Sequence, residues 1–354
     1  AHDEAGREFL ACGDEVGWAR TRIFWLVASH RLGRGAAALT EVEHARKVFA
    51  RHGIWLRAAG LDHNSAYVCR ELGRYDRALA LYDRAQTTYE ALGPSSASRV
   101  GWTKQGKANL LTTMGDFSTA LRLHEEARAV FVEHGDTVDV LRQDENIGSV
   151  YAGLGYTTRA LQSFSATLAA LDEAGLFVDA AWVALKMADC YLTLNRNDDA
   201  IDVAIDAATR FDRFGTATEA AKARASAAVA HARNGDAGRA LELLDQAGAE
   251  FEDAGLSTQI GLVVLHRALL HMSQGRWDEA RRDASRAHCL LEEQGLVLPC
   301  TQADLISAKA SLAIGDGTTA ARLAESALAT AQTREVLAFA QEAHHVLGQV
   351  AECR

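Results

Sequence analysis

The chain has 354 residues, a formal net charge of −10, 48% hydrophobic residues and only two prolines. This charge disfavours a main role in binding the phosphate backbone of nucleic acids. The sequence contains no apolar run of about 18 residues and no basic segment before a shorter apolar one, so we expect neither a membrane span nor a signal peptide. The six cysteines include no C-x-x-C pair, which favours reduced thiols and a cytoplasmic location.

An alanine recurs along the chain at a spacing of 40 residues, with one step of 42. These alanines are Ala38, Ala78, Ala120, Ala160, Ala200, Ala240, Ala280 and Ala320. A glycine or asparagine stands five residues before each, at Gly33, Gly73, Gly115, Gly155, Asn195, Gly235, Gly275 and Gly315. A fixed period of this length indicates an α-solenoid, whose units bury their apolar faces only against their neighbours. The pattern therefore favours an interaction surface over an enzyme.

The first residues fit the second half of such a unit. Ala5, Phe9 and Gly13 take the places that a small residue, an aromatic residue and a glycine take one period later. We therefore expect residues 1–13 to form a partial repeat, with the chain opening inside the second helix of a preceding unit.

Eight full units follow, each predicted to be a pair of antiparallel helices. In one unit, residues 58–72 and 75–91 carry amphipathic patterns, and Gly73 lies between them as a residue suited to the left-handed conformation at a helix end. Asn195 is the next best residue for that conformation. The predicted repeats are residues 14–53, 54–93, 94–135, 136–175, 176–215, 216–255, 256–295 and 296–334.

The last residues, 335–354, are predicted to form the first helix of a final partial repeat without its second helix. We expect an unpaired apolar stripe along it, made of Val336, Leu337, Phe339, Val346, Leu347 and Val350. A solenoid end normally carries a polar outer face. The stripe therefore predicts an additional domain of the same polypeptide, and a homodimer formed through the stripe is the alternative.

The order of small, tyrosine, glycine, alanine and aromatic residues carries a resemblance to a known repeat. It is clearest at Gly148, Tyr151, Gly155, Ala160, Phe164 and Thr167. The chain resembles the tetratricopeptide repeat (TPR), in a long 40-residue bacterial form whose closing proline is replaced by glycine. Residues 73–85 and 188–201 resemble the arrays that precede caspase-like CHAT protease domains. The resemblance implies an all-α, TPR-like α-solenoid: a right-handed superhelix of antiparallel helix pairs that binds peptides or proteins.

In such arrays the first helix of each pair lines the concave groove. The groove positions of repeats two to five combine amides, aromatics and both charges, a mixture suited to an extended peptide ligand. These predicted ligand-binding residues are His63, Asn64, Tyr67, Arg70, Trp102, Gln105, Asn109, Arg142, Glu145, Asn146, Trp182, Lys186 and Asp189. Asn64 and Asn146 resemble the asparagines with which TPR arrays hold the backbone of a ligand.

The groove positions of repeats six to eight are apolar instead. They are Val229, Ala232, Leu262, Leu265, Leu269, Met272, Leu305, Ile306 and Leu312. An exposed strip of this length would promote association, so one expectation is that a helix of a partner covers it. The other is that tighter curvature buries these residues against neighbouring repeats.

No pattern predicts catalysis, a cofactor or a metal site. Gly101, Gly106 and Lys107 have the spacing of a phosphate-binding loop, but Ala108 takes the place of its hydroxyl residue and no strand precedes it. The adjacent pair His344 and His345 would diverge on a helix. His288 and Cys289 are neighbours without the third group that a nucleophile requires.

The leading interpretation is a non-catalytic binding domain that senses or scaffolds a partner and regulates an attached or associated effector, which by resemblance would be a CHAT-type protease. A second interpretation is the sensor array of a regulatory ATPase that controls transcription, with a small inducer or an inhibitory protein as ligand. A third is a passive assembly scaffold.

Overall fold

The computed structural model describes residues 2–32 and 34–352, so Gly33 and Cys353 lie outside the described residues. Within these ranges it contains eighteen α-helices, one short 3-10 helix and no strand. The predicted all-α fold is confirmed. No described helix combines the length and the apolar character needed to cross a membrane.

The chain divides into two compact units, Ala1–Ala170 and Leu171–Arg354, here called unit 1 and unit 2. The helices that begin in unit 1 are α1 (His2–Ala11), α2 (Glu15–Arg31), α3 (Gly35–Arg51), α4 (Trp55–Glu71), α5 (Tyr75–Ala91), η1 (Pro94–Ser96), α6 (Ala97–Met114), α7 (Phe117–His134), α8 (Thr137–Gly153) and α9 (Thr157–Glu173). The helices of unit 2 are α10 (Phe177–Thr193), α11 (Asn197–Arg213), α12 (Ala217–Arg233), α13 (Ala237–Asp253), α14 (Ser257–Ser273), α15 (Trp277–Glu292), α16 (Val297–Ala313), α17 (Gly317–Thr333) and α18 (Leu337–Glu352).

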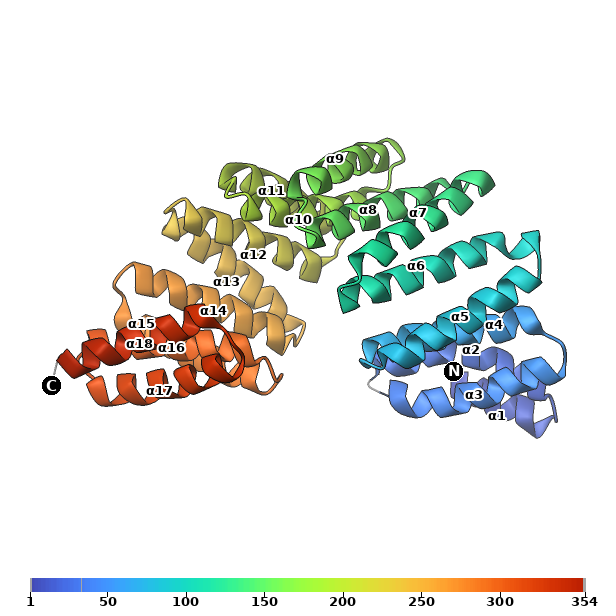
Figure 1. Ribbon diagram of the computed structural model, residues 1–354, viewed down its shortest axis with the longest axis horizontal. Coiled ribbons are helices and arrows are strands. Elements are labelled where there is room, and N and C mark those ends of the chain that lie inside the picture. Colours follow the sequence, from blue (N-terminus) through green and yellow to red (C-terminus); the bar gives the residue numbers. More distant parts are fainter. Residues whose placement is uncertain (1, 33, 353–354) are drawn as a thin grey trace. The chain divides into compact units, whose positions relative to one another are not determined.

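Within each unit, every helix packs against the helices that precede and follow it in the chain (Figure 1). The helices predicted over 58–72 and 75–91 are observed as α4 and α5. A glycine in the left-handed region ends each of them, as at Gly73 with φ +70°. Asn195 has φ +56° and takes the same role after α10, as the sequence predicts.

The periodic alanines lie where consecutive helices touch, and none of them is more than 2% exposed. Large side chains such as Phe131 and Phe251 are buried in these contacts between helices. A methyl group added to Gly148 on α8 would come within 2.6 Å of the Phe164 ring on α9. Because carbon atoms pack at about 3.5–4.0 Å, only a residue without a side chain fits this contact.

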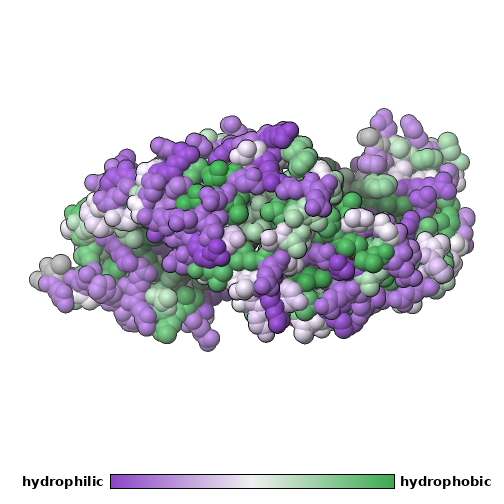
Figure 2. All heavy atoms as spheres, turned by 90° about the horizontal axis from the view of Figure 1, so that it is seen from above, coloured by the Kyte–Doolittle hydropathy of each residue, from purple (hydrophilic) through white to green (hydrophobic). Residues whose placement is uncertain are grey.

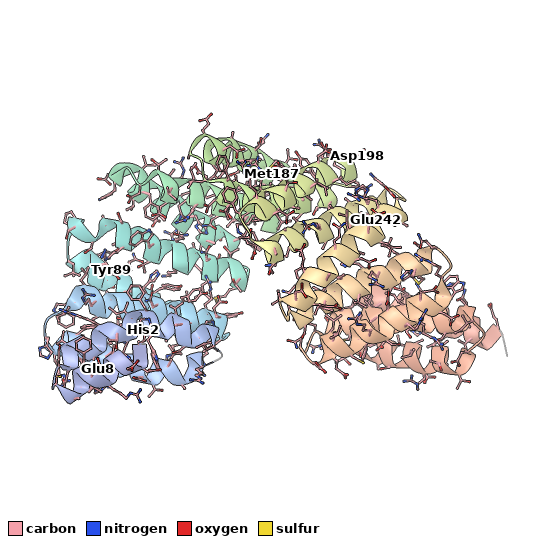
Figure 3. All side chains as sticks on the ribbon, turned by 180° about the vertical axis from the view of Figure 1, so that it is seen from behind. His2, Glu8, Tyr89, Met187, Asp198 and Glu242 are labelled. Carbon is pink, nitrogen blue, oxygen red and sulfur yellow. The ribbon has the colours of Figure 1, made fainter. Side chains whose placement is uncertain are left out.

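Charged residues of unit 2 lie mostly at its surface and helix ends, while its interior is mainly apolar. Figure 3 labels Asp198 in the first turn of α11 and Glu242 on α13, both exposed, and Met187 on α10, which is buried. The face drawn in Figure 2 carries hydrophobic residues in separate patches among hydrophilic ones.

The helix α18 is covered more fully than the sequence predicts. Val346 and Val350 are buried against α16 and α17, together with Ala320 and Ala324. Phe339 is half-buried, whereas Leu337 is 71% exposed. The prediction of a fully unpaired stripe is therefore wrong, because the two preceding helices already enclose its inner half.

Besides Asn195, Glu335 adopts the left-handed conformation where other units carry glycine. Glu335 has φ +58° at the position that Gly295 occupies one period earlier. Because a side chain in this conformation costs about 1 kcal/mol, we expect Glu335→Gly to raise the free energy of unfolding by about that amount. Glu325→Gly, in the middle of α17, should lower it by about 1 kcal/mol. Urea unfolding followed by circular dichroism measures both values, and destabilisation by Glu335→Gly would contradict this account.

Candidate functional site

The first helices of successive pairs touch one another, in the order α2, α4, α6 and α8 in unit 1 and α10, α12, α14, α16 and α18 in unit 2. From α3 to α7 and from α11 to α17, second helices of successive pairs make no comparable contact. The chain therefore curves toward its first helices within each unit. We call the solvent-facing surface of these helices the inner face.

An aromatic and charged cluster marks the inner face of unit 1. The Trp102 ring on α6 is 42% exposed, and its Nε1 donates a hydrogen bond of 2.8 Å to Asp139 on α8. Arg142 lies 3.4 Å from the same carboxylate. These contacts fix an exposed indole beside a guanidinium, and both groups are common in binding hot spots.

A second cluster lies on α4. The Arg70 guanidinium stacks 5.1 Å from the centre of the Tyr67 ring and pairs with Glu71 at 2.8 Å. Asn64 Nδ2 donates to the backbone oxygen of Ile23 on α2, at 3.1 Å. The amide donor of Asn64 thus joins two first helices of the chain, which the sequence could not indicate.

The remaining predicted groove residues of unit 1 lie on α6 and α8. All four are half-buried on these two touching helices: Gln105, Asn109, Glu145 and Asn146.

His63 differs from the prediction. Its Nδ1 lies 3.3 Å from the hydroxyl of Thr103, and its ring meets the Tyr82 ring edge-on with centroids 5.5 Å apart. Burial lowers the pKa of His63 to about 4. The residue thus contacts α5 and α6 as well as lying on α4, and it is half-buried.

In unit 2, the predicted residues Trp182, Lys186 and Asp189 all lie on α10. The Trp182 ring packs edge-on against Phe211, with centroids 5.4 Å apart. Lys222 Nζ on α12 lies 5.4 Å from the centre of the same indole. Sequence reasoning missed Lys222, although it has the same register in its repeat as Trp182.

A pocket of about 340 Å³ opens on the inner face between α12 and α14, and we call it the inner pocket. Its wall includes Val229, Ala232 and Leu269, three residues of the predicted apolar strip. The other lining residues are Ala228, Arg233, Leu244, His266, Leu270 and Ser273. The sequence prediction passed over Arg233, His266 and Ser273 because it considered only the apolar positions of this region.

The polar residues of the inner pocket are held in place by the helices. His266 Nδ1 lies 2.9 Å from the backbone oxygen of Leu262, and burial lowers the pKa of His266. Arg233 donates a hydrogen bond of 2.6 Å to the backbone oxygen of Leu192 on α10. The pocket is therefore apolar with a neutral imidazole and a fixed guanidinium at its edge.

A second recess of about 500 Å³ lies near the C-terminal ends of α14, α16 and α18. Met272 and Leu312 of the predicted apolar strip line it, beside Trp277, Lys309, Ala313, Gln349 and Glu352. Its apolar wall is thus interrupted by charged groups.

Three of the four remaining residues of the predicted apolar strip are buried. Leu265, Leu305 and Ile306 are at most 3% exposed, and Leu262 is half-buried. Direct contact between α14 and α16 encloses these side chains. The expectation of burial by neighbouring repeats is therefore right for them, and that of a continuous exposed strip is wrong.

The segment with phosphate-loop spacing lies inside α6. A methyl group on Gly106 would meet the Tyr82 ring at 2.7 Å, and Lys107 pairs with Asp83. These glycines serve helix packing. His344, His345 and Cys289 are exposed, and the described ranges contain no cluster of three or more His, Cys, Asp or Glu residues that could hold a metal.

Comparisons with known proteins agree with this architecture. Residues 57–132 match the family model of the tetratricopeptide repeat. A search of curated protein sequences found no match. The chain is similar to a signal transduction ATPase with numerous domains (STAND) that carries a TPR sensor, from Pyrococcus horikoshii, at 12% identity over 94% of this chain and 55% of that chain, with a TM-score of 0.67.

Two further solved structures are similar over most of their length. The apo quorum sensor NprR from B. thuringiensis is 10% identical over 89% of this chain and 88% of that chain, with a TM-score of 0.66. A Rap protein complexed with competence and sporulation factor is 13% identical over 96% of this chain and 100% of that chain, with a TM-score of 0.57. At these identities the similarity shows a TPR-like helical solenoid.

The enclosed imidazole of His63 predicts a pH dependence. Its pKa of about 4 in the folded chain lies below the usual value of 6.5, so its contribution to stability is present above pH 6.5 and is lost as the pH falls toward 4. Between pH 7.5 and pH 5 this loss amounts to about 2 kcal/mol. We expect the free energy of unfolding of His63→Gln, measured with urea, to fall by about 2 kcal/mol less than that of the parent chain over this pH range. The exposed control His344→Gln should follow the parent, and equal losses for all three chains would contradict the assignment.

Proposed function

We propose that this chain is a non-catalytic binding domain whose inner faces hold a peptide or protein, and that binding regulates an attached or associated effector. The inner pocket of unit 2 carries the proposal. Its volume of about 340 Å³ suits one or two side chains of a ligand, and sites for small ligands span about 300–1,000 Å³. Leu244, Leu269 and Leu270 would contact an apolar side chain, and Arg233 would reach a carbonyl or carboxylate at the edge.

The inner face of unit 1 supports the same function with different chemistry. Trp102 and Tyr67 present aromatic surface, and each lies beside an arginine that is held by a carboxylate. Such rigid groups lose little conformational entropy when a ligand binds. Asn146 would supply an amide for the backbone of an extended peptide.

The compared structures support a peptide as the class of ligand. One is a quorum sensor, and another is a Rap protein complexed with competence and sporulation factor. Their fold is shared with this chain, and their ligands suggest what an inner face of this kind can hold.

Two kinds of effector suit a domain of this type. A regulatory ATPase is supported by the similarity to the STAND protein with a TPR sensor, of which this chain spans 55%. A CHAT-type protease is supported by the sequence resemblance of residues 73–85 and 188–201. In either case the ligand must bind two states of the array with different affinity in order to switch the effector. A passive scaffold, joined to an additional domain or to a second copy of the chain, would bind without such a difference.

Filling the inner pocket tests the proposal. We expect peptides selected on the immobilised chain from a phage-displayed random library to bind Ala232→Trp at least tenfold more weakly than the parent chain, because the indole would occupy the pocket. Isothermal titration calorimetry gives the affinities, and the melting temperature reports folding. Ala249→Trp, on the exposed side of α13, is the matched control and should bind normally. Failure to select any peptide, or full affinity of Ala232→Trp, would reject this site.

A further inference from the structure

A larger cleft, of about 740 Å³, lies on the second-helix side of unit 2, away from the inner face. Its walls are the second helices α15 and α17, and its floor is the first helix α16 between them. The residues that matter for its chemistry are Arg281, Arg282, His288, Asp304, Arg322 and Ser326. We call it the outer cleft.

The corresponding place in unit 1 is closed by an ion-pair cluster. Asp62 on α4 lies eleven residues before Gly73, as Asp304 on α16 lies eleven before Gly315. Arg46 Nε on α3 donates hydrogen bonds of 2.9 and 3.0 Å to the two carboxylate oxygens of Asp62. Arg84 Nε on α5 donates a hydrogen bond of 2.9 Å to the same carboxylate. The two guanidinium groups leave the Asp62 side chain 2% exposed.

Shorter residues replace both arginines in the outer cleft. His288 on α15 has the register of Arg46, and Ser326 on α17 has the register of Arg84. His288 Nδ1 still lies 2.9 Å from Asp304, whose side chain is 15% exposed. Ser326 brings no charge to the carboxylate and lines the cleft instead. The cleft therefore opens where unit 1 holds the Arg84 side chain.

The environment of Asp304 is that of a carboxylate with too few partners. Burial raises its pKa, and the nearby His288 and Arg322 oppose this effect only in part. Glu292, at the same end of the cleft, adds a second negative charge 3.6 Å from His288. This end of the outer cleft favours a cation.

The other end of the cleft is basic. Arg281 lies 3.7 Å from Asp278, and Arg282 makes only a long contact of 3.4 Å with the backbone oxygen of the same residue. Arg322 on α17 forms no ion pair within residues 2–32 and 34–352, but its positive charge acts on Asp304 and works to lower the pKa of that carboxyl. The corresponding positions in unit 1 are uncharged: Leu39, Thr40 and Ala80.

We propose that the outer cleft is a second binding site, which takes a short peptide segment with an arginine guanidinium on Asp304 and an acidic group against Arg281 and Arg282. The contact of Arg84 with Asp62 is the internal example of the first interaction. From Arg282 to His288, which contacts Asp304, the helix α15 rises by about 9 Å, so the two charges of the ligand are separated by a few residues. This site lies beyond the inner-face function proposed above.

The probe for this site is the peptide acetyl-Glu-Gly-Gly-Gly-Arg-amide, titrated into the full chain by calorimetry. Replacing arginine with citrulline keeps the shape of the side chain and removes its charge, and we expect at least a tenfold loss of affinity. Replacing the glutamate with glutamine should also weaken binding. No binding at millimolar peptide, or equal binding of the citrulline peptide, would overturn the proposal.

A matched pair of variants locates the site. Ser326→Arg restores the arginine of unit 1 and should reduce peptide affinity at least tenfold without lowering the melting temperature, whereas Ser326→Ala leaves the cleft open and should bind normally. Asp304→Asn should lose affinity to a similar extent. The inner-pocket variant Ala232→Trp should retain binding, which separates this site from the inner face. Unchanged binding by Ser326→Arg would overturn the assignment.

Discussion

The close contact of small side chains between consecutive helices is the constraint on which this structure depends. The periodic alanines are at most 2% exposed, and Gly148 lies so near Phe164 that no side chain fits. Because interiors are close-packed, a larger residue at these positions would force the helices apart. The same contact repeats along each unit, so each helix is positioned mainly by its neighbours in the sequence.

A scaffold of this kind leaves the remaining positions free to differ between repeats. The position eleven residues before the first glycine of a repeat shows this clearly. Asp62 and Asp144 pair with an arginine of the preceding helix, Lys104 pairs with Glu126, and Asp304 pairs with a histidine. One register position thus carries a closed ion-pair cluster in one repeat and the floor of an open cleft in another. Ligand chemistry can change here without altering the fold.

The sequence predicted the helices well because the signals are local and repeated. Glycine and asparagine at the helix ends, alanine at the contacts and a period of 40 residues all point to one architecture. The burial of individual groove residues was predicted less well. His63 and Leu265 have the spacing of groove residues, but the next first helix partly covers His63, and Leu265 is buried; the spacing within one helix contains no information about that neighbour.

The candidate site was predicted only in its general position. The predicted aromatic and amide residues lie on first helices, whereas the inner pocket includes Arg233, His266 and Ser273, which an apolar pattern does not indicate. The outer cleft depends on a comparison between repeats. Ser326 becomes informative only when the contact of Arg84 with Asp62 is known.

Removal of one predicted repeat tests the central claim most directly. Deleting residues 216–255 joins Gly215 to Leu256 and removes one period of 40 residues, including α12 and α13. If helices are held only by their neighbours, the shortened chain will keep the same circular dichroism per residue at 222 nm and unfold cooperatively. Deleting residues 216–235 alone, which breaks the alternation of first and second helices, will lower the helical signal. Loss of helix in the first deletion, or equal tolerance of both, would contradict the account.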